Sequence, residues 1–197
     1  MLKSLFIYIG TGKTGSTSLQ TFFEKYSSLT SSISYWGLNL DMKTDNKGDC
    51  HYYEWQKKEG IGIIQKMDYQ AFNSELVSAL NNIYKLETNK YAIWINESIY
   101  HMSKHFLEPI DVFSKQNNVD IKFIGAARDY PSYLSSAYKQ WGVKHKTYKG
   151  SVQDFEQWCS NAKDFLQYSK HFSAWEYAFP GKLKLINFQN TNDIITK

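Results

Sequence analysis

Residues 5–19 read LFIYIGTGKTGSTSL, an apolar stretch that runs into a turn rich in glycine and hydroxyl residues. The apolar part, Leu5 to Ile9, is typical of a buried strand. A glycine-rich turn follows at residues 10–15, and an amphipathic helix is expected to begin at about Ser16. Backbone N–H groups and the helix dipole favour an anion in such a turn, and Lys13 adds a full positive charge. The stretch therefore predicts a turn that binds phosphate or a phosphate-like group.

Two common phosphate-binding patterns fit this turn unequally. The Walker A pattern requires a glycine at the position that Ile7 occupies inside the strand, so the nucleoside-triphosphatase pattern fails on spacing. The dinucleotide pattern Gly-x-Gly-x-x-Gly does match Gly10, Gly12 and Gly15. Such a loop rarely places a lysine against the pyrophosphate, and no clear ribose-binding acid follows a second strand, so an oxidoreductase is the least favoured alternative.

A second segment, residues 119–141, reads VDIKFIGAARDYPSYLSSAYKQW. Its first half predicts a strand, Ile121 to Ala127, that ends in Arg128, and Pro131 suits the first turn of a helix that runs to Trp141. Ser136 follows in that helix. Arginine suits a phosphate because its planar fork binds two oxygens at once. A strand-end arginine before a serine-rich helix is also an ordinary surface arrangement. The segment therefore indicates a phosphate site only in combination with the glycine-rich turn.

Together the two segments resemble the sulfotransferases that use 3′-phosphoadenosine 5′-phosphosulfate (PAPS). The run Lys-Thr-Gly-Ser-Thr at 13–17 is similar to the loop that holds the 5′-phosphosulfate in that family, and Arg128 with Ser136 resembles its 3′-phosphate motif. An aromatic helix before a late strand, residues 183–188, is similar to glycan-type members. The cofactor-binding residues that the resemblance implies are Gly12, Lys13, Thr14, Gly15, Ser16, Thr17, Ser18, Arg128 and Ser136.

The same resemblance implies one catalytic lysine and one general base, and the sequence offers three candidates for the base. Lys13 is the expected partner of the bridging oxygen and of the leaving phosphate of PAPS. Glu97 follows the predicted strand 91–95 and is the first candidate for the base that deprotonates the acceptor, with a helix N-terminal carboxylate as its structural alternative. His101 is the second candidate and His51, in a long loop, the third. The mechanism requires no metal.

The alternation of apolar strands with amphipathic helices predicts an α/β fold, three layers with a central, mainly parallel sheet and a P-loop-like turn. Strands are expected at 5–9, 33–36, 91–95, 121–127 and 183–188, and helices at 68–87, 99–113 and 131–141, with two aromatic helices before the last strand. Residues 41–60 are expected to form a surface loop. Residues 1–197 are expected to be one domain. The resemblance implies further helices after the last strand, so the alternatives are a compact member, a member shortened at its C-terminus and a degenerate copy.

Composition sets the remaining expectations. The net charge of +4 fits an anionic nucleotide cofactor but falls short of a nucleic-acid footprint. The two cysteines predict neither a disulfide framework nor a metal cluster, and no run reaches transmembrane length, so a cytoplasmic protein is expected. The expected function is transfer of a sulfuryl group from PAPS to a hydroxyl or amine, most plausibly of a carbohydrate. The alternatives are a P-loop kinase-like enzyme and a non-catalytic protein that binds PAPS or its product 3′-phosphoadenosine 5′-phosphate (PAP).

Overall fold

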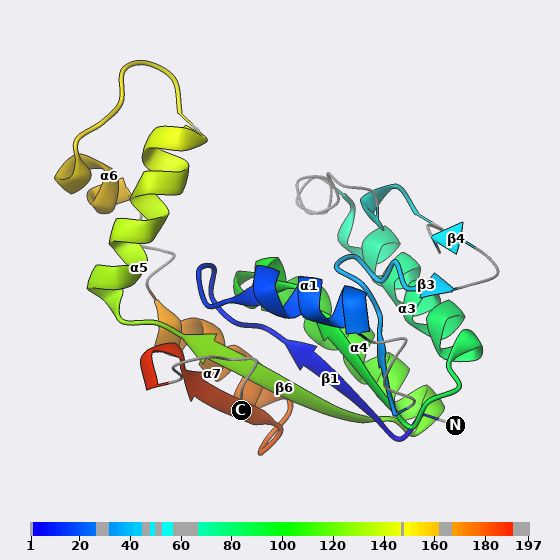
Figure 1. Ribbon diagram of the computed structural model, residues 1–197. Helices are drawn as coiled ribbons and strands as arrows, with labels where there is room; N and C mark the ends of the chain where they lie inside the picture. The colour runs from blue at the N-terminus through cyan, green and yellow to red at the C-terminus, as the bar shows by residue number, and fades with distance from the viewer. Residues whose placement is uncertain are drawn as a thin grey trace.

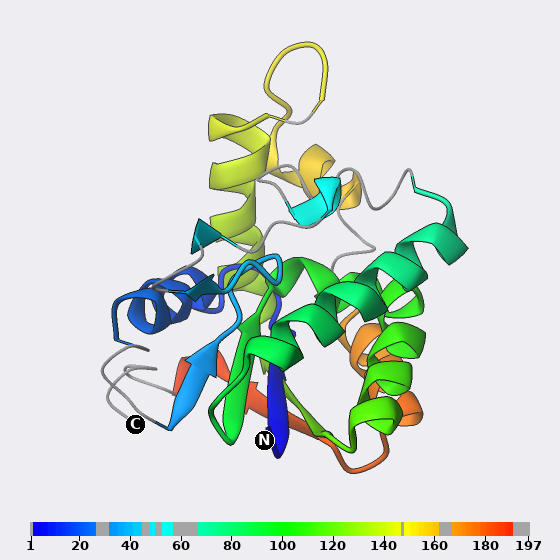
Figure 2. The ribbon, with the colours of Figure 1, turned by 90° about the vertical axis from the view of Figure 1, so that its right-hand side faces the viewer.

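The computed structural model of the chain describes residues 2–26, 32–44, 48–49, 53–56, 67–146, 148–161 and 167–190. At its centre lies a sheet of five parallel strands in the order β2-β5-β1-β6-β7 (Figure 1, Figure 2). All five strands fall where the sequence predicts them, and β1 and β5 in particular are apolar runs that end at turn residues. Their bounds are β1 Ser4–Tyr8, β2 Ile33–Tyr35, β5 Tyr91–Ile95, β6 Asp120–Ala127 and β7 Leu183–Asn187.

The first strand, β1, is the middle strand of the sheet. Tyr8 at its end is in register with Ile95 of β5 on one side and with Ile124 of β6 on the other. Since the strands are parallel, the segments that follow β1, β5 and β6 emerge at the same edge. The strand next to β1 is β5 rather than β2, which departs from the 3-2-1-4-5-6 order of the dinucleotide-binding fold. The strand order is therefore not that of the dinucleotide-binding fold.

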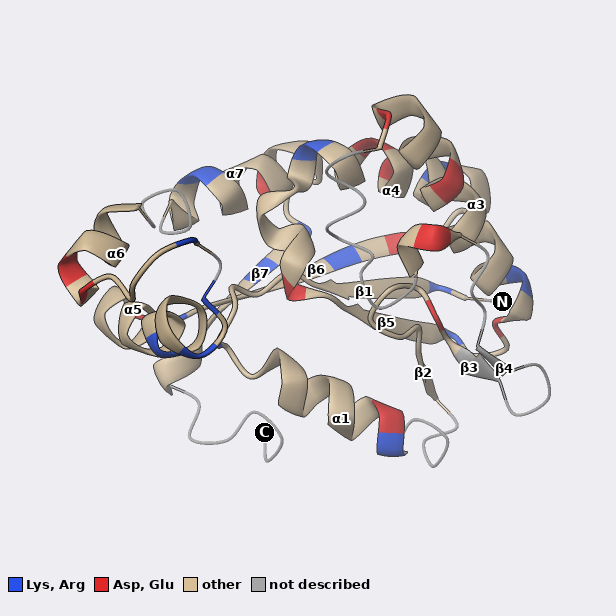
Figure 3. Cartoon of the chain, turned by 90° about the horizontal axis from the view of Figure 1, so that it is seen from above, with Lys and Arg blue, Asp and Glu red and all other residues tan. Residues whose placement is uncertain are grey.

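The helices cover the sheet in two unequal layers. The connection from β1 to β2 runs toward one edge of the sheet, while the later connections run toward the other edge. Because parallel crossovers are right-handed, the first helix lies on one face and the later ones on the opposite face. Figure 3 shows α1 alone below the sheet and α3, α4 and α7 above it. Their bounds are α1 Ser16–Tyr26, α3 Tyr69–Leu86, α4 Ser103–Asn117 and α7 Tyr168–Ala178.

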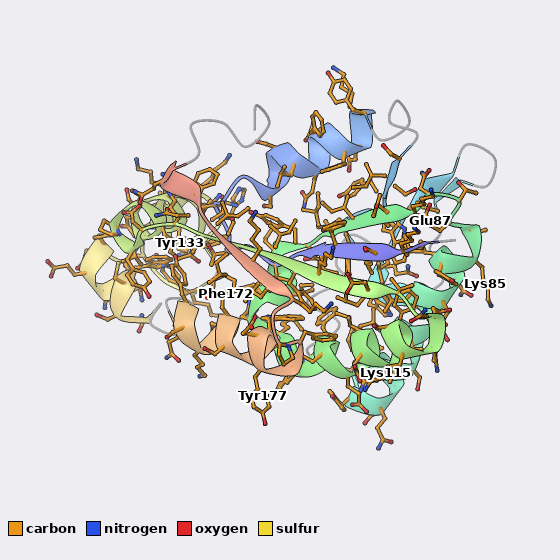
Figure 4. The ribbon with its side chains drawn as sticks, turned by 90° about the horizontal axis from the view of Figure 1, so that it is seen from below. Lys85, Glu87, Lys115, Tyr133, Phe172 and Tyr177 are labelled. Carbon is orange, nitrogen blue, oxygen red and sulfur yellow. The ribbon has the colours of Figure 1, made fainter. Side chains whose placement is uncertain are left out.

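The layers enclose two apolar cores, which makes the fold the predicted three-layer α/β arrangement. The larger core lies between the sheet and the α3, α4 and α7 layer, and Figure 4 shows Phe172 at the α7 end of it. The smaller core lies between the sheet and α1 and includes Tyr8, Tyr35 and Ile95. No helix in the described ranges is both long and apolar enough to cross a bilayer.

The segment 41–60 differs from the expected surface loop. It contains a short hairpin, β3 Lys43–Thr44 with β4 Gly48–Asp49, and a 3-10 turn, η2 Glu54–Gln56. Trp55 is only 2% exposed and its ring packs edge-on against Phe72 of α3, 5.6 Å between ring centres. The buried Gln56 amide donates to the carbonyl of Leu40 at 2.7 Å. The expectation of a surface loop is therefore wrong for these residues, because a tryptophan anchors the polar stretch to the core. His51 lies outside the described residues.

Two predicted helices are each divided. The expected helix 99–113 is a 3-10 turn, η3 Glu97–His101, followed by α4, since the Asn96 side chain accepts from Ser98 N at 3.0 Å and caps η3 separately. The expected helix 131–141 is α5, Tyr130–Ala137, followed by a π-helical segment, η4 Tyr138–Lys144. Figure 1 shows α5 standing away from the sheet beside α6, which spans Phe155–Asn161.

Candidate functional site

The glycine-rich turn, residues 10–15, is fixed to the sheet at its start. Thr11 N donates to Ala126 O of β6 at 2.8 Å, which extends the pairing of β1 beyond its end. At Gly10 a Cβ atom would lie 2.5 Å from the Tyr8 hydroxyl, so this position has no space for a side chain. The backbone of the turn can therefore lie close against the phenol only because residue 10 is glycine.

The middle of the turn is braced from below by Thr14 and Tyr8. Thr14 is fully buried; its hydroxyl donates to the carbonyl of Thr11, and the Tyr8 hydroxyl donates to Thr14 O at 2.8 Å. Burial raises the pKa of Tyr8 to about 12, so the phenol keeps its proton at neutral pH. Thr14 thus supports the turn from inside, which the pattern of hydroxyl residues could not reveal.

A cavity of about 260 Å³ opens in front of the turn at the carboxyl edge of the sheet. Three separate segments form it: the turn with the start of α1, the η3 turn, and the α5–η4 region. Its volume is just below that of a complete small-molecule site, so it fits a tetrahedral anion and the group that reacts with it rather than a whole nucleotide. The cavity is lined by Gly12, Lys13, Gly15, Ser16, Thr17, Glu97, Ser98, Tyr100, His101, Tyr133, Gln140 and Trp141.

The cavity brings together most of the residues that the sequence nominated. Lys13 and the first two candidate bases, Glu97 and His101, lie on its wall. Of the predicted cofactor-binding residues in the turn, Thr14 faces inward instead, and Ser18 is exposed on α1 beside a separate depression. Those that share the wall with the catalytic candidates are Gly12, Lys13, Gly15, Ser16 and Thr17.

Lys13 supplies the positive charge of the cavity. Its backbone is left-handed, with φ at 67°, and its ammonium lies 5.6 Å from the centre of the Trp141 ring. Burial lowers the pKa of Lys13, Glu97 opposes that shift, and Lys144 adds to it. A cation held between an aromatic face and a glycine-rich turn provides the electrostatic attraction that a phosphate or sulfate requires.

Glu97 is held in place by the first helix. Gln20 of α1 donates from its amide nitrogen both to the Glu97 carboxylate, at 3.3 Å, and to Ile95 O at the end of β5, at 3.2 Å. The helix that follows the turn thus also orients the first candidate base. The side chain is half-buried and reaches the same cavity as Lys13.

His101 stands at the mouth of the cavity and keeps an exposed surface. Its imidazole lies 6.5 Å from that of His171 on α7, ring centre to ring centre. Burial against the protein, with His171 as the second cause, lowers the pKa of His101. The ring therefore favours its neutral form near pH 7, which is the form that accepts a proton.

The lowered pKa of His101 predicts how stability depends on pH. In the unfolded chain the His101 imidazole takes up a proton near pH 6.5, and in the folded chain only at a lower pH. Between these two pKa values the unfolded state therefore binds more protons than the folded state. Acidification through this window should destabilise the fold, with a shallow slope because the ring is partly exposed. When the pH is lowered from 7 to 5, we expect the thermal midpoint of the wild type to fall more than that of His101→Gln, which lacks the imidazole. A difference between the two proteins that does not change with pH would contradict this.

The second predicted phosphate site lies away from the cavity wall. Arg128 follows β6 directly and is the only arginine among the 23 lysine and arginine residues of the chain. Its guanidinium lies 5.8 Å from the centre of the Phe188 ring, and its buried Nε has no hydrogen-bond partner within the described ranges. Ser136 is half-buried in the last turn of α5. Neither residue lines the cavity around Lys13.

Sequence reasoning missed the aromatic wall of the cavity. Tyr100 and Tyr133 are each 4% exposed and line it, together with Gln140 and Trp141. The spacing of Trp141 with Leu134 and Ala137 indicates core packing in an α-helix. The π-helical segment η4 has a wider helical turn than an α-helix at this point. Trp141 packs over Gly12, where an added Cβ atom would lie 3.1 Å from the Trp141 ring. A π-helical turn has no sequence signature here.

The chain was also compared with known proteins. No protein-family model matches it, and no curated protein matches its sequence. The residues of the cavity and the strand order are therefore the grounds for a functional proposal.

Proposed function

We propose that the chain is a sulfotransferase that moves a sulfuryl group from PAPS to a hydroxyl or amine, on a glycan acceptor. The observation that carries the proposal is the shared cavity. A lysine within a glycine-rich turn faces the same space as a carboxylate and an imidazole that favours its neutral form. Sulfuryl transfer needs these groups together, because one oxygen gains negative charge while another loses a proton.

The residues of the cavity divide the reaction between them. An acceptor oxygen or nitrogen attacks the sulfur, the bond from sulfur to the bridging oxygen breaks, and its electron pair remains on the phosphate of PAP. Lys13 neutralises that oxygen as its charge grows. Glu97, held by Gln20, takes the acceptor proton, with His101 as the second candidate base. No net oxidation occurs, as in phosphoryl transfer.

The position of Arg128 also supports the proposal. The 3′-phosphate and the 5′-phosphosulfate of PAPS lie on different carbons of the ribose, so two separate anion sites at one sheet edge are what the molecule requires. The sole arginine of a lysine-rich chain follows the strand next to the glycine-rich turn, with one donor unpartnered. An unpartnered buried donor costs free energy that an anion in contact with the guanidinium would recover.

Calorimetric titration with PAP and with ADP tests the cofactor. A hydrogen bond to a charged group contributes about 1.5–3 kcal/mol, so Arg128→Ala should weaken PAP by about 10- to 150-fold. ADP lacks the 3′-phosphate and should be almost unaffected. Lys122→Ala is a matched control, since Lys122 is an exposed cation on the same strand.

Three outcomes separate the alternatives. A preference for PAP that Arg128→Ala removes would support the sulfotransferase. Equal affinity for PAP and ADP would contradict it, and tight binding of ATP with magnesium would favour a kinase-like enzyme. Binding of PAP without transfer to any acceptor would point to a binding protein.

A further inference from the structure

One segment between Asp129 and Asp154, residues 130–153, holds four of the 23 lysine and arginine residues and is here called the basic arm. It comprises α5, the π-helical segment η4 and the loop before α6. No Asp or Glu occurs in it, so its formal charge of +4 equals the net charge of the entire chain. The other residues sum to zero. The basic residues of the arm are Lys139, Lys144, Lys146 and Lys149, with His145 among them.

The arm is a folded scaffold. The Tyr138 hydroxyl donates to Gln153 O at 2.6 Å, and the Tyr148 hydroxyl donates to Gly142 O at 2.7 Å. Tyr148 also accepts from Gln153 N at 3.0 Å. A small apolar cluster around Tyr133, Ala137 and Trp158 packs the inner side. These bonds tie Tyr148 and Gln153, from the described part of the loop, back onto α5 and η4.

The lysines of the arm are available to a ligand. Lys139, Lys144 and Lys149 are exposed, and they form no ion pair within the part of the chain that the structure describes. Lys146 donates to Gly150 O. Figure 3 shows basic residues at the α5 end of the molecule and acidic residues on the neighbouring α6, as well as on α3 and α4. A chain of anions would meet attraction along the arm and repulsion beyond it.

The arm also forms one wall of the cavity. Gln140 and Trp141 belong to it and line the space in front of Lys13. At about 260 Å³ this space admits only the reacting end of an acceptor, so the remainder must lie outside. Lys139 and Lys144 stand close in sequence to Gln140 and Trp141, and both are exposed. Val143 and Val152 of the arm are exposed as well.

We propose that the basic arm binds an acidic polysaccharide, with its carboxylate or sulfate groups along the lysines and one hydroxyl or amine in the cavity. This rests on the proposed function, since that function requires a hydroxyl or amine acceptor. An acidic polysaccharide carries acceptor groups and regularly spaced charges in one polymer. The charge of +4 and the pI of about 8.8 are below the usual footprint of a nucleic-acid-binding domain, which favours the polysaccharide.

The test measures the affinity of the full chain for heparin, used as a sulfated and uronate-bearing probe. Dextran serves as the neutral polysaccharide and single-stranded DNA as a second polyanion. The variant Lys139→Glu/Lys149→Glu reverses two exposed charges of the arm. The control Lys85→Glu/Lys115→Glu makes the same change in net charge at the other end of the molecule, far from Tyr133 in Figure 4. PAP binding is measured on every variant.

We expect heparin to bind more tightly than DNA, dextran not to bind, and salt to weaken the heparin complex. The arm variant should lose about 10-fold in heparin affinity while the control keeps it. Equal losses in both variants, equal binding of DNA, or no heparin binding would each overturn the proposal. PAP affinity should stay unchanged in the arm variant, which shows that a loss of heparin binding does not come from a damaged cofactor site. A wild type that binds heparin but not PAP would refute the proposed function and leave the polyanion-binding surface.

Discussion

Lys13→Ala is expected to lower turnover by about 100- to 1000-fold, the usual cost of removing one group that stabilises charge in the transition state. The ammonium faces the cavity and lies against the Trp141 ring, where the leaving oxygen would gain its charge. PAP is also anionic, so its affinity should fall as well. The fall should stay below about tenfold, that is below 1.4 kcal/mol, because the charge of Lys13 is needed most in the transition state, as the leaving group departs.

The measurement is the rate of PAP release from PAPS with an acceptor that the wild type uses, beside calorimetric affinity for PAP. Lys25→Ala is the matched control, because Lys25 is exposed at the end of α1, the helix that follows the turn, and its ammonium lies over the Tyr26 ring. The control should keep both quantities. If Lys13→Ala reduced turnover and PAP affinity by the same factor, Lys13 would only bind the nucleotide and would have no separate role in the transition state.

Trp175→Ala is expected to lower the free energy of unfolding by about 3–5 kcal/mol, as for other large-to-small changes in a core. Trp175 has no exposed surface, and its ring lies 5.0 Å from that of Phe123 on β6. Its indole nitrogen donates to Tyr100 O at 3.1 Å, which ties α7 to η3. Loss of this side chain therefore removes apolar packing and one support of the turn that carries Glu97 and His101.

Urea denaturation measures the effect. Trp175→Phe keeps most of the volume but leaves the Tyr100 carbonyl unpaired, so it should cost about 1–3 kcal/mol. Tyr177→Ala is the control on the same helix, because Tyr177 is 89% exposed and points to solvent in Figure 4. It should change stability by no more than about 0.5 kcal/mol. A Trp175→Ala protein as stable as the Tyr177→Ala protein would show that α7 does not support η3.

The sequence predicts the sheet well because its strands depend on local composition. The apolar runs of β1, β5 and β6 leave little choice of conformation, and the glycine-rich turn after β1 requires residues that tolerate close contacts. The grouping of Lys13, Glu97 and His101 also follows from the sequence, since parallel strands end at one edge.

The remaining features depend on contacts between distant segments. Trp55 is buried within a polar stretch because the core beneath α3 has room for it, and no local pattern records that space. Trp141 reaches the cavity from η4, a π-helical segment that the sequence does not predict. Thr14 resembles its hydroxyl neighbours in sequence, but Tyr8 fixes it inside the turn. The direction of a side chain in a turn is set by such partners.

The left-handed backbone at Lys13 has a consequence for the evolution of stability in this protein. A side chain in that conformation costs about 1–2 kcal/mol relative to glycine, which adopts it freely. Lysine at this position is therefore a local compromise, in which the fold gives up stability to place an ammonium before the cavity. Selection for heat resistance alone would favour glycine here. A thermostable descendant that kept the lysine would have gained its stability elsewhere, under a requirement for the charge.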